Sequence, residues 1–236
     1  MIPVLVIPTL NRVDMLEKCI RSIDHEVALL VVIDNSGGLT QYRREWFSPL
    51  IKKSVFIGHP NAGVAASWNE AIKLFPADYW VFSNDDIEFR PGSLAEFEKA
   101  IDANKDSAAA IVANCGASLW AVTHRGLLKV GLFDENFYPA YLEDFDWFHR
   151  VKLAGEHILQ APGVLVNHHG SQTVKGGRQY QKENDRTFAN NSEYYRQKWG
   201  GHWKHETFSR PFNDPQWPLD VWRFEPGMRK INQWKV

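Results

Sequence analysis

The chain has 236 residues, which is enough for one large domain or two small ones and for a sizeable core. Its 27 basic and 28 acidic residues nearly cancel, so the composition implies no general polyanion-binding surface, although a local basic site for phosphates is still compatible with it. No apolar run reaches the roughly 20 residues that a membrane span needs.

The start of the chain and its cysteines bear on the compartment. Met1 leads directly into a strand-like segment, without the basic stretch and cleavage site of a signal peptide. Cys19 lies on the apolar side of a predicted helix, and neither it nor Cys115 has a metal-ligand neighbour in sequence. We therefore expect buried thiols in a reducing compartment and a soluble, cytoplasmic protein.

The first half of the sequence alternates short apolar runs with segments of helical periodicity. The apolar runs are residues 4–7, 29–33, 55–57 and 79–82, and apolar side chains recur at helical spacing over residues 15–23 and 64–75. This alternation predicts an α/β fold in which a mostly parallel, Rossmann-like sheet carries helices on both faces.

The second half is mixed and ends in an irregular segment. Strands are predicted at residues 108–112, 118–122 and 164–166, and helices at 125–130, 142–153 and about 180–199. Pro and Trp residues interrupt every pattern after residue 200. We expect one domain over residues 1–200 and an extended arm over residues 201–236, which packs on the domain or on a neighbouring copy in a homo-oligomer. The ten tryptophans suit a core, an interface or a platform for sugar rings, and composition does not choose.

Polar clusters follow the four predicted strands of the first half, at residues 9–12, 34–36, 61–63 and 84–86. In sheets of this kind, ligands bind beyond the carboxyl ends of the strands. Each cluster has a simpler alternative: Asn11, Asp14 and Asn61 are residue types that cap helices, and Asp34 before two glycines is typical of a turn. Four such clusters at one sheet edge favour a binding site.

The cluster at Asn84, Asp85 and Asp86 is the most specific of the four. Two adjacent carboxylates after a buried strand repel each other unless a cation or a donor group lies between them. Oxygen ligands suit Mg²⁺ or Mn²⁺, ions that usually arrive with a diphosphate. The alternative is a solvated turn or a helix cap.

Taken in order, these segments and several later ones resemble the family 2-type glycosyltransferases with the GT-A fold. The similar segments are residues 7–12, 32–36, 61–63 with 68–69, 83–86, 130–135, 141–146 with Arg150, 168–171 and 195–200. The resemblance covers about residues 1–200, and Gly-Leu-Phe-Asp-Glu at 131–135 and Glu-Asp-Phe-Asp at 143–146 are its most specific parts. One departure is Asn84, which replaces the first carboxylate of a strict Asp-X-Asp and leaves Asp86 as the main metal ligand.

The resemblance implies a nucleotide-sugar donor site. Asp34 would accept a hydrogen bond from the imide N–H of uracil or thymine, which implies a UDP-sugar or a dTDP-sugar. Asp85 would reach the ribose or the donor sugar, and Gly63 would let the backbone approach the base closely. The other implied donor-site residues are Pro8, Thr9, Asn11, Arg12, Asn61, Asn69, Asn84 and Lys198, with Lys175 and Arg178 as looser candidates for the diphosphate.

The resemblance also implies the metal ligands. Asp86 would bind Mn²⁺ or Mg²⁺ between the phosphates, with His168 as a second ligand. Because side chains alternate along an extended segment, one of His168 and His169 should face inward, and the His-X-Gly spacing favours His168. The alternative is a pair of surface histidines.

Asp144 is the implied catalytic base, which would take the proton from the acceptor hydroxyl in an inverting transfer. Glu143 would contact the acceptor, and Asp146 would serve the structure. At the start of a helix the dipole stabilises a carboxylate, so we expect the pKa of Asp144 to stay near its usual value. The alternative is an ordinary charged helix N-terminus.

The sequence therefore predicts an inverting, metal-dependent glycosyltransferase. A nucleotidyltransferase that makes a nucleotide sugar is one alternative, but the loop at residues 8–12 lacks the glycines that such enzymes use to bind a triphosphate. A non-catalytic sugar- or nucleotide-binding module is the other. The acceptor is left open among a glycan, a lipid-linked sugar, a protein side chain and a modified base in nucleic acid.

Overall fold

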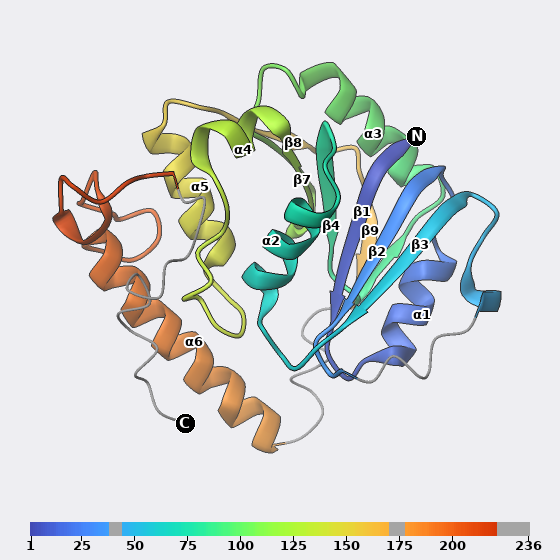
Figure 1. Ribbon diagram of the computed structural model, residues 1–236, viewed down its shortest axis with the longest axis horizontal. Coiled ribbons are helices and arrows are strands. Elements are labelled where there is room, and N and C mark those ends of the chain that lie inside the picture. The colour runs from blue at the N-terminus through green and yellow to red at the C-terminus, as the bar shows by residue number, and fades with distance from the viewer. Residues whose placement is uncertain (38–43, 170–177, 221–236) are drawn as a thin grey trace.

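The computed structural model describes residues 1–37, 44–169 and 178–220 of the chain (Figure 1). The strands are β1 (Ile2–Thr9), β2 (Val27–Asp34), β3 (Ile51–Gly58), β4 (Tyr79–Ser83), β5 (Ile87–Phe89), β6 (Ala110–Ala113), β7 (Gly116–Thr123), β8 (Ile158–Ala161) and β9 (Val166–His168). The α-helices are α1 (Val13–Arg21), α2 (Val64–Leu74), α3 (Ser93–Asn104), α4 (His124–Val130), α5 (Glu143–Leu153) and α6 (Arg178–Trp199). Short 3-10 helices lie at Arg44–Trp46 and Pro211–Asn213.

A seven-stranded sheet in the order β3-β2-β1-β4-β7-β6-β8 forms the centre of the domain. Strands β3, β2, β1 and β4 are parallel to one another. Strand β7 runs antiparallel between β4 and β6, and β8 is parallel to β6. The predicted α/β architecture with a mostly parallel sheet is confirmed. The register pairs Thr9 with Asp34 and Asp34 with Gly58, so the loops after β1, β2 and β3 leave the sheet at one edge.

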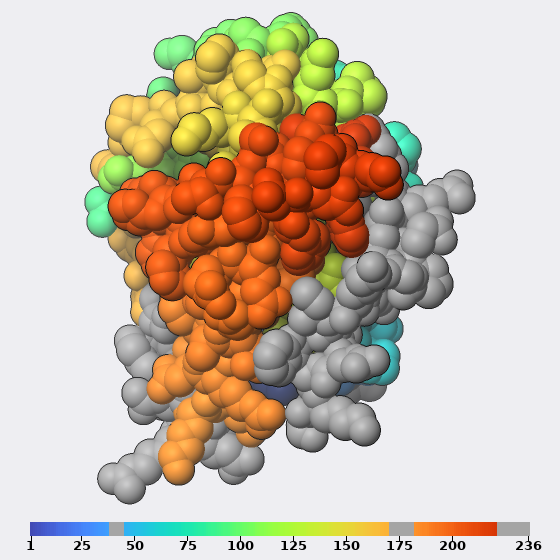
Figure 2. All heavy atoms as spheres, turned by 90° about the vertical axis from the view of Figure 1, so that its left-hand side faces the viewer, coloured from blue at the N-terminus to red at the C-terminus, as the bar shows by residue number. Residues whose placement is uncertain are grey.

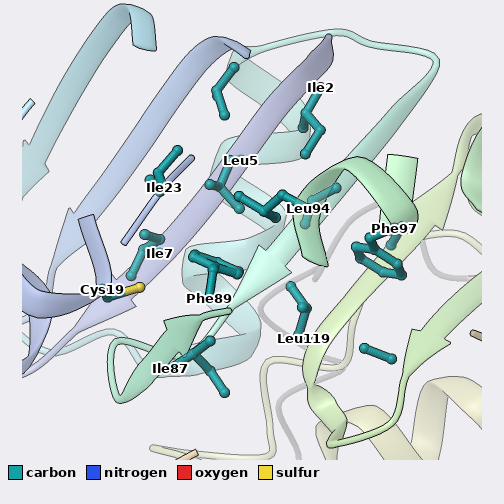
Figure 3. Packing of buried hydrophobic residues seen from close by; sticks show 14 of the residues in the cluster. Ile2, Leu5, Ile7, Cys19, Ile23, Ile87, Phe89, Leu94, Phe97 and Leu119 are labelled. Atoms are coloured by element: carbon teal, nitrogen blue, oxygen red, sulfur yellow. The ribbon is translucent and has the colours of Figure 1, made fainter. Parts of the chain in front are cut away.

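Both faces of the sheet are apolar because successive side chains of a strand point to opposite sides. Leu5 and Ile7 of β1 belong to a core that α1 and α3 cover, whereas Val4 and Val6 belong to a second core beneath α2, α4 and α5. Figure 3 shows Leu5 and Leu94 pointing toward one another between β1 and α3 in the first core. Helices therefore pack on both faces, as predicted.

Aromatic side chains fill much of the second core. Trp120 of β7 lies at its centre, with ring centroids 5.4 Å from Trp68, 5.5 Å from Phe133 and 5.7 Å from Trp147. The interplanar angles of these pairs, between 69° and 76°, are those of edge-to-face contacts, which favour aromatic packing beyond the area that it buries. Several of the tryptophans that composition left unassigned thus belong to the core.

Helix α6 forms an outer layer with the residues that follow it. Tyr194, Tyr195 and Trp199 of α6 pack against Phe137 and Leu142. Phe212 and Leu219, which follow the helix, pack against this cluster, and Figure 2 shows α6 and residues 200–220 on the surface of this face. The described part of the predicted arm therefore packs on its own domain, while residues 221–236 lie outside the described residues.

Across the described ranges 1–37, 44–169 and 178–220, none of the helices combines the length and the apolar character required to cross a lipid bilayer.

Candidate functional site

A cavity of about 540 Å³ opens at the edge of the sheet where the loops after β1 and β4 leave it. It brings together predicted site residues that are far apart in sequence: Pro8, Thr9, Asn61, Gly63, Asn84, Asp85, Asp86, Glu143, Asp144 and His168. The first strand, the loop before α2, the acidic turn after β4, the start of α5 and the end of β9 thus contribute to one site.

The two carboxylates after β4 have different environments. Thr9 Oγ1 donates a hydrogen bond of 2.6 Å to Asp85 Oδ2. Burial raises the pKa of Asp85 to about 6, and the Thr9 hydroxyl partly opposes that rise. Asp86 has a different environment: its Oδ1 is buried and makes no hydrogen bond with any described residue. A buried carboxylate oxygen needs a partner, and the charged group that the structure places near it is His168.

The small sheet formed by β5 and β9 places a histidine beside Asp86. Ile87 pairs with His168 in this sheet, and the backbone N–H of His169 donates to Asp86 O at 3.0 Å. His168 Nε2 consequently lies 3.3 Å from Asp86 Oδ1, without the alignment of a hydrogen bond. The ring of His169 turns instead to Glu88, at 2.7 Å. Of the two histidines, His168 is the one that lines the cavity.

The pair of Asp86 and His168 fits a divalent cation by its chemistry. One carboxylate oxygen and one imidazole nitrogen are a donor set that Mn²⁺ accepts readily and Mg²⁺ somewhat less so. No group of three or more His, Cys, Asp or Glu side chains is arranged around a metal within the part of the chain that the structure describes. A cation held by these two side chains would therefore complete its coordination with water and with oxygens of a bound ligand.

The two carboxylates at the start of α5 follow a strained stretch of backbone. Tyr141 and Leu142 have φ values of 81° and 74°, in the left-handed region that side chains rarely adopt and that is often found at functional sites. This turn points the first residues of the helix into the cavity. The N–H of Phe145 donates to Asp144 Oδ1 at 2.8 Å and orients that carboxylate.

The expectation that the pKa of Asp144 stays near its usual value is wrong. Burial raises the pKa of Asp144 to about 6, because removal of water disfavours the charged form more than the backbone N–H groups favour it. Glu143 is 6% exposed, and its Oε2 has no hydrogen-bond partner among the described residues. Burial and the neighbouring Asp144 both raise the pKa of Glu143. The pair thus holds protons more tightly than exposed carboxylates do.

Helix α6 supports the strained turn from the other side. Asn191, which is 4% exposed, donates from Nδ2 to Ala140 O at 2.6 Å and to Tyr141 O at 3.0 Å. The Tyr141 hydroxyl also contacts Asn184 Oδ1 in a short hydrogen bond. The position of the α5 carboxylates therefore depends on side chains of α6 that lie more than forty residues after the turn that they support.

We expect Asn191→Ala to loosen the turn before α5. Two half-buried hydrogen bonds are lost, which together costs about 1–3 kcal/mol of folding stability. We expect kcat to fall while the KM for the sugar donor changes little. Chemical denaturation and steady-state kinetics measure the two effects. Asn190→Ala, at the half-buried position beside it, is the matched control; equal kinetics for both variants would contradict the supporting role.

Gly63 lets two loops meet at the rim of the cavity. Its φ is 90°, and an added Cβ would lie 2.9 Å from Pro139 O. The same oxygen accepts a hydrogen bond of 2.8 Å from Val64 N–H, and Asn61 Oδ1 accepts one of 3.0 Å from Gly63 N–H. The resemblance implied a close approach of the Gly63 backbone to the base of a nucleotide. The close approach that the structure itself shows is to Pro139, in the loop before α5.

Three residues of the predicted donor site lie outside the cavity lining, around the first two strands. Asn11 is exposed, with a φ of 57°, and Arg12 pairs with Asp14 at 3.1 Å. Asp34 is 2% exposed, and its Oδ1 accepts hydrogen bonds from the N–H and the hydroxyl of Ser36 at 2.7 Å and 2.5 Å. It organises the turn after β2, and the neighbouring Asn35 lines the cavity in its place.

Asn69 also lies outside the cavity, where it holds a loop. Its Nδ2 donates to Phe133 O and its Oδ1 accepts from Phe133 N–H, both at 2.9 Å. Nδ2 also reaches Glu135 Oε1 at 2.9 Å. The family-like segment at residues 131–135 is therefore attached to α2 through this amide, which is fully buried.

Lys198 is placed differently from its predicted role. It is 2% exposed and does not line the cavity. Its Nζ lies 2.7 Å from Asp134 Oδ2 and 2.6 Å from Asp146 Oδ1, inside the domain. An ammonium engaged by two buried carboxylates does not reach a diphosphate in the cavity, so we assign Lys198 to the core. Asp146, expected to serve the structure, belongs to the same network. Lys175 lies outside the described residues, as does the side chain of Arg178.

Sequence reasoning missed one side of the cavity. This side is formed by the turn before α5, by α5 and α6, and by the segment after α6. Its residues are Tyr141, Phe145, Glu183, Asn184, Thr187, Phe188 and Trp203. The density of tryptophans was a signal for a ligand platform, but nothing in the sequence separates an exposed ring from a core ring.

Residues 4–152 match the family model for glycosyl transferase family 2. The chain belongs to this family. The match favours glycosyl transfer over the nucleotidyltransferase and non-catalytic alternatives.

Individual relatives agree with the family. A galactofuranosyl glycosyltransferase from Leishmania donovani is 27% identical over 140 residues, which cover 50% of this chain and 31% of that protein. The mannosyltransferase PcManGT from Pyrobaculum calidifontis, solved with GDP-mannose and Mn²⁺, has a TM-score of 0.57 at 16% identity, over 69% of this chain and 55% of that one. S. aureus TarS 1-349 in complex with UDP has a TM-score of 0.53 at 15% identity, over 68% and 57%.

The solved structures confirm the predicted GT-A fold, since they resemble this chain in architecture at low sequence identity. The chain spans 31% of the length of the curated relative and little more than half of the solved chains.

Proposed function

We propose that this chain transfers a sugar from a nucleoside-diphosphate sugar to a hydroxyl group of an acceptor, with inversion at the anomeric carbon. The observation that carries the proposal is that Asp86, His168 and Asp144 line one cavity although they come from three distant segments. One wall of that cavity thus offers a cation site and the other offers a base.

Asp144 acts as the general base. Its carboxylate takes the proton from the acceptor hydroxyl as the oxygen attacks the anomeric carbon on the face opposite the leaving diphosphate. A pKa of about 6 leaves most of Asp144 ionised at neutral pH and makes it a stronger base than an exposed aspartate. Glu143 lies beside it in the cavity and contacts the acceptor.

Asp86 and His168 would hold the divalent cation. When bound, that cation neutralises the charge that develops on the leaving diphosphate. Asp85, fixed by Thr9, lies next to this position and binds the ribose or the donor sugar. Asn61, Gly63 and Asn84 complete the donor side of the cavity.

The choice of nucleotide depends on which side chain binds the base. The resemblance implied a UDP-sugar or a dTDP-sugar through Asp34, but Asp34 Oδ1 is bonded within its own turn and the residue does not line the cavity. Two of the solved relatives were obtained in complex with GDP-mannose and Mn²⁺ and with UDP. Donors of all three nucleotides therefore belong in the test.

The proposed activity is tested by incubating the protein with UDP-, dTDP- and GDP-sugars and Mn²⁺ and measuring the release of nucleoside diphosphate. We expect release from one class of donor and none without a divalent cation. Release of pyrophosphate from a nucleoside triphosphate would instead support the nucleotidyltransferase alternative.

We expect His168→Ala and Asp86→Asn to weaken the binding of Mn²⁺ in the presence of nucleoside diphosphate by about tenfold or more, because each removes one of two protein ligands. Electron paramagnetic resonance of Mn²⁺ measures this binding without any turnover. His169→Ala is the matched control, since its ring faces Glu88. Wild-type affinity in His168→Ala, or an equal loss in His169→Ala, would contradict the assignment.

A further inference from the structure

Four aromatic side chains form one side of the cavity, beside the α5 carboxylates. They are Tyr141, Phe145, Phe188 and Trp203, and we call them the aromatic wall. Phe145 and Trp203 are stacked, with centroids 5.1 Å apart and planes 10° from parallel. Phe188 contacts Trp203 edge-on at 6.4 Å and Tyr141 at 5.9 Å. The rings thus support one another as a continuous surface.

The outer rings of this wall are accessible from the cavity. Phe188 is 40% exposed and Trp203 is 38% exposed, whereas Trp80, Trp120, Trp147 and Trp199 are fully buried in the cores. An exposed aromatic pair inside a concave site gains free energy when a ligand covers it. The wall therefore has the properties of a binding surface rather than of a core.

Polar side chains of α6 border the same surface. Glu183, Asn184 and Thr187 line the cavity together with Phe188, and the spacing of these four positions places them on one side of the helix. Their carboxylate, amide and hydroxyl groups accept or donate hydrogen bonds. Flat apolar rings beside such groups match a sugar, whose ring presents a face of C–H groups and an edge of hydroxyls.

The wall lies on the acceptor side of the proposed reaction. Phe145 follows Asp144 directly in α5, and Tyr141 belongs to the strained turn before it. The cation pair Asp86 and His168 belongs to the acidic turn and to β9, which are different segments of the cavity lining. A ring that lies on the wall is thus next to the base that removes a proton from the attacking hydroxyl.

The charge of the lining favours an uncharged acceptor. Asp85, Asp86, Glu143, Asp144 and Glu183 all line the cavity. Within the described ranges no Lys or Arg side chain lines it, and His168 is its basic group. Glu143, Asp144 and Glu183 are the titratable groups beside the aromatic rings, so the described part of this side offers no positive charge to attract a phosphate-rich polymer.

We propose that the aromatic wall is the acceptor subsite and that it binds a neutral sugar ring, the terminal hexose of a glycan or glycoside. This inference rests on the proposed function and adds the class of acceptor to it. The hexose stacks on Trp203 and Phe188, its hydroxyls bond to the polar groups of α6, and one hydroxyl faces Asp144.

Two measurements on Trp203→Ala and Phe188→Ala test the subsite. The first is saturation-transfer NMR with methyl glycosides of neutral hexoses, in the absence of a donor. The second is steady-state transfer to the same glycosides, together with the slow transfer of the donor sugar to water. Leu128→Ala, which removes a side chain that is 58% exposed on α4, is the matched control, and thermal unfolding checks that each variant is folded.

We expect both wall variants to weaken glycoside binding and to raise the acceptor KM by about tenfold, the equivalent of one aromatic contact. Glycoside binding, the acceptor KM and the rate of donor hydrolysis of Leu128→Ala should all stay at the wild-type values. Comparison of methyl with octyl glycosides then shows whether a free glycan or a lipid-linked sugar is the better source of the ring.

Three results would overturn the subsite. One is wild-type glycoside binding in Trp203→Ala, another is no binding of any neutral glycoside to the wild-type protein, and a third is tighter binding of single-stranded oligonucleotides than of glycosides. Failure of the proposed function is a separate result, since it shows as the absence of donor hydrolysis in the wild-type protein, whatever the NMR experiment finds.

Discussion

Asp144→Asn is expected to lower kcat by about 10²–10⁴-fold, the usual contribution of a positioned general base. The amide keeps the size of the side chain and can still contact the Phe145 N–H through its oxygen, but it has no basic atom for the acceptor proton. Donor affinity should change little, because Asp86 and His168 hold the cation from other segments of the cavity. Steady-state transfer and calorimetric titration with the donor measure the two quantities.

The control for this variant is Asp102→Asn, which removes an exposed carboxylate of α3. It should behave as the wild type in both measurements. A kcat for Asp144→Asn within threefold of the wild-type value would remove Asp144 from the reaction and direct attention to Glu143, the other carboxylate at the start of α5.

The raised pKa of Asp144 adds a signature in the pH profile. The base works only when it is deprotonated, so activity should be full at high pH and should fall as the pH drops through about 6. An exposed aspartate would keep activity down to about pH 4. A profile of kcat between pH 4.5 and 8, with the Mn²⁺ concentration saturating at each pH, separates these outcomes.

The main strands of the first half were predictable from the sequence because they are continuous apolar runs. The apolar runs at 4–7, 29–33 and 79–82 are buried on both sides in β1, β2 and β4, so their composition alone identifies them. Helix α3 is absent from the sequence prediction although Leu94, Phe97 and Ile101 have helical spacing. The run at 164–166 belongs to β9, which starts two residues later and pairs with the short β5 outside the main sheet.

The part of the cavity formed by the loops after β1 and β4 was predictable and the aromatic wall was not, for a physical reason. Loops after parallel strands leave the sheet at one edge, and because β1 and β4 are neighbours, Thr9 and Asp85 meet there. The aromatic wall depends on how α6 crosses the domain, which is set by packing of Tyr195 and Trp199 into a separate cluster. No local pattern in α6 states which of its aromatic residues face that cluster and which face a ligand.

Lys198 and Asn69 show a second limit of sequence reasoning. Both stand in segments that resemble the family, and both are polar types that bind phosphates or sugars readily. Their actual partners, Asp134 for Lys198 and Phe133 for Asn69, are 64 residues away in each case. A polar residue whose partner is that distant cannot be told from a ligand-binding residue until the tertiary contact is known.

Lys198→Met is expected to cost about 3–5 kcal/mol of folding stability, as the loss of one partner of a buried ion pair does. Burial acts to raise the pKa of Asp134, but the charge and hydrogen bond of Lys198, with the hydrogen bonds from Asn136 and Tyr194, together outweigh it and keep that pKa below its usual value. Without the ammonium, Asp134 keeps the Tyr194 hydroxyl at 2.7 Å and the N–H and Nδ2 of Asn136 at 2.9 Å and 2.8 Å, but these neutral donors do not balance the charge of a buried carboxylate. Chemical denaturation measures the loss.

Two further variants show whether the loss comes from the buried charge. Asp134→Asn combined with Lys198→Met should be more stable than Lys198→Met alone, because the stranded carboxylate is gone, while Asp146 keeps Arg150 at 2.9 Å. Arg196→Met, which breaks the exposed pair with Glu193 on the same helix, should leave stability unchanged within error. If Lys198→Met instead kept wild-type stability and lost affinity for the nucleotide sugar, Lys198 would be a ligand of the diphosphate. Its assignment to the core, between Asp134 and Asp146, would then be wrong.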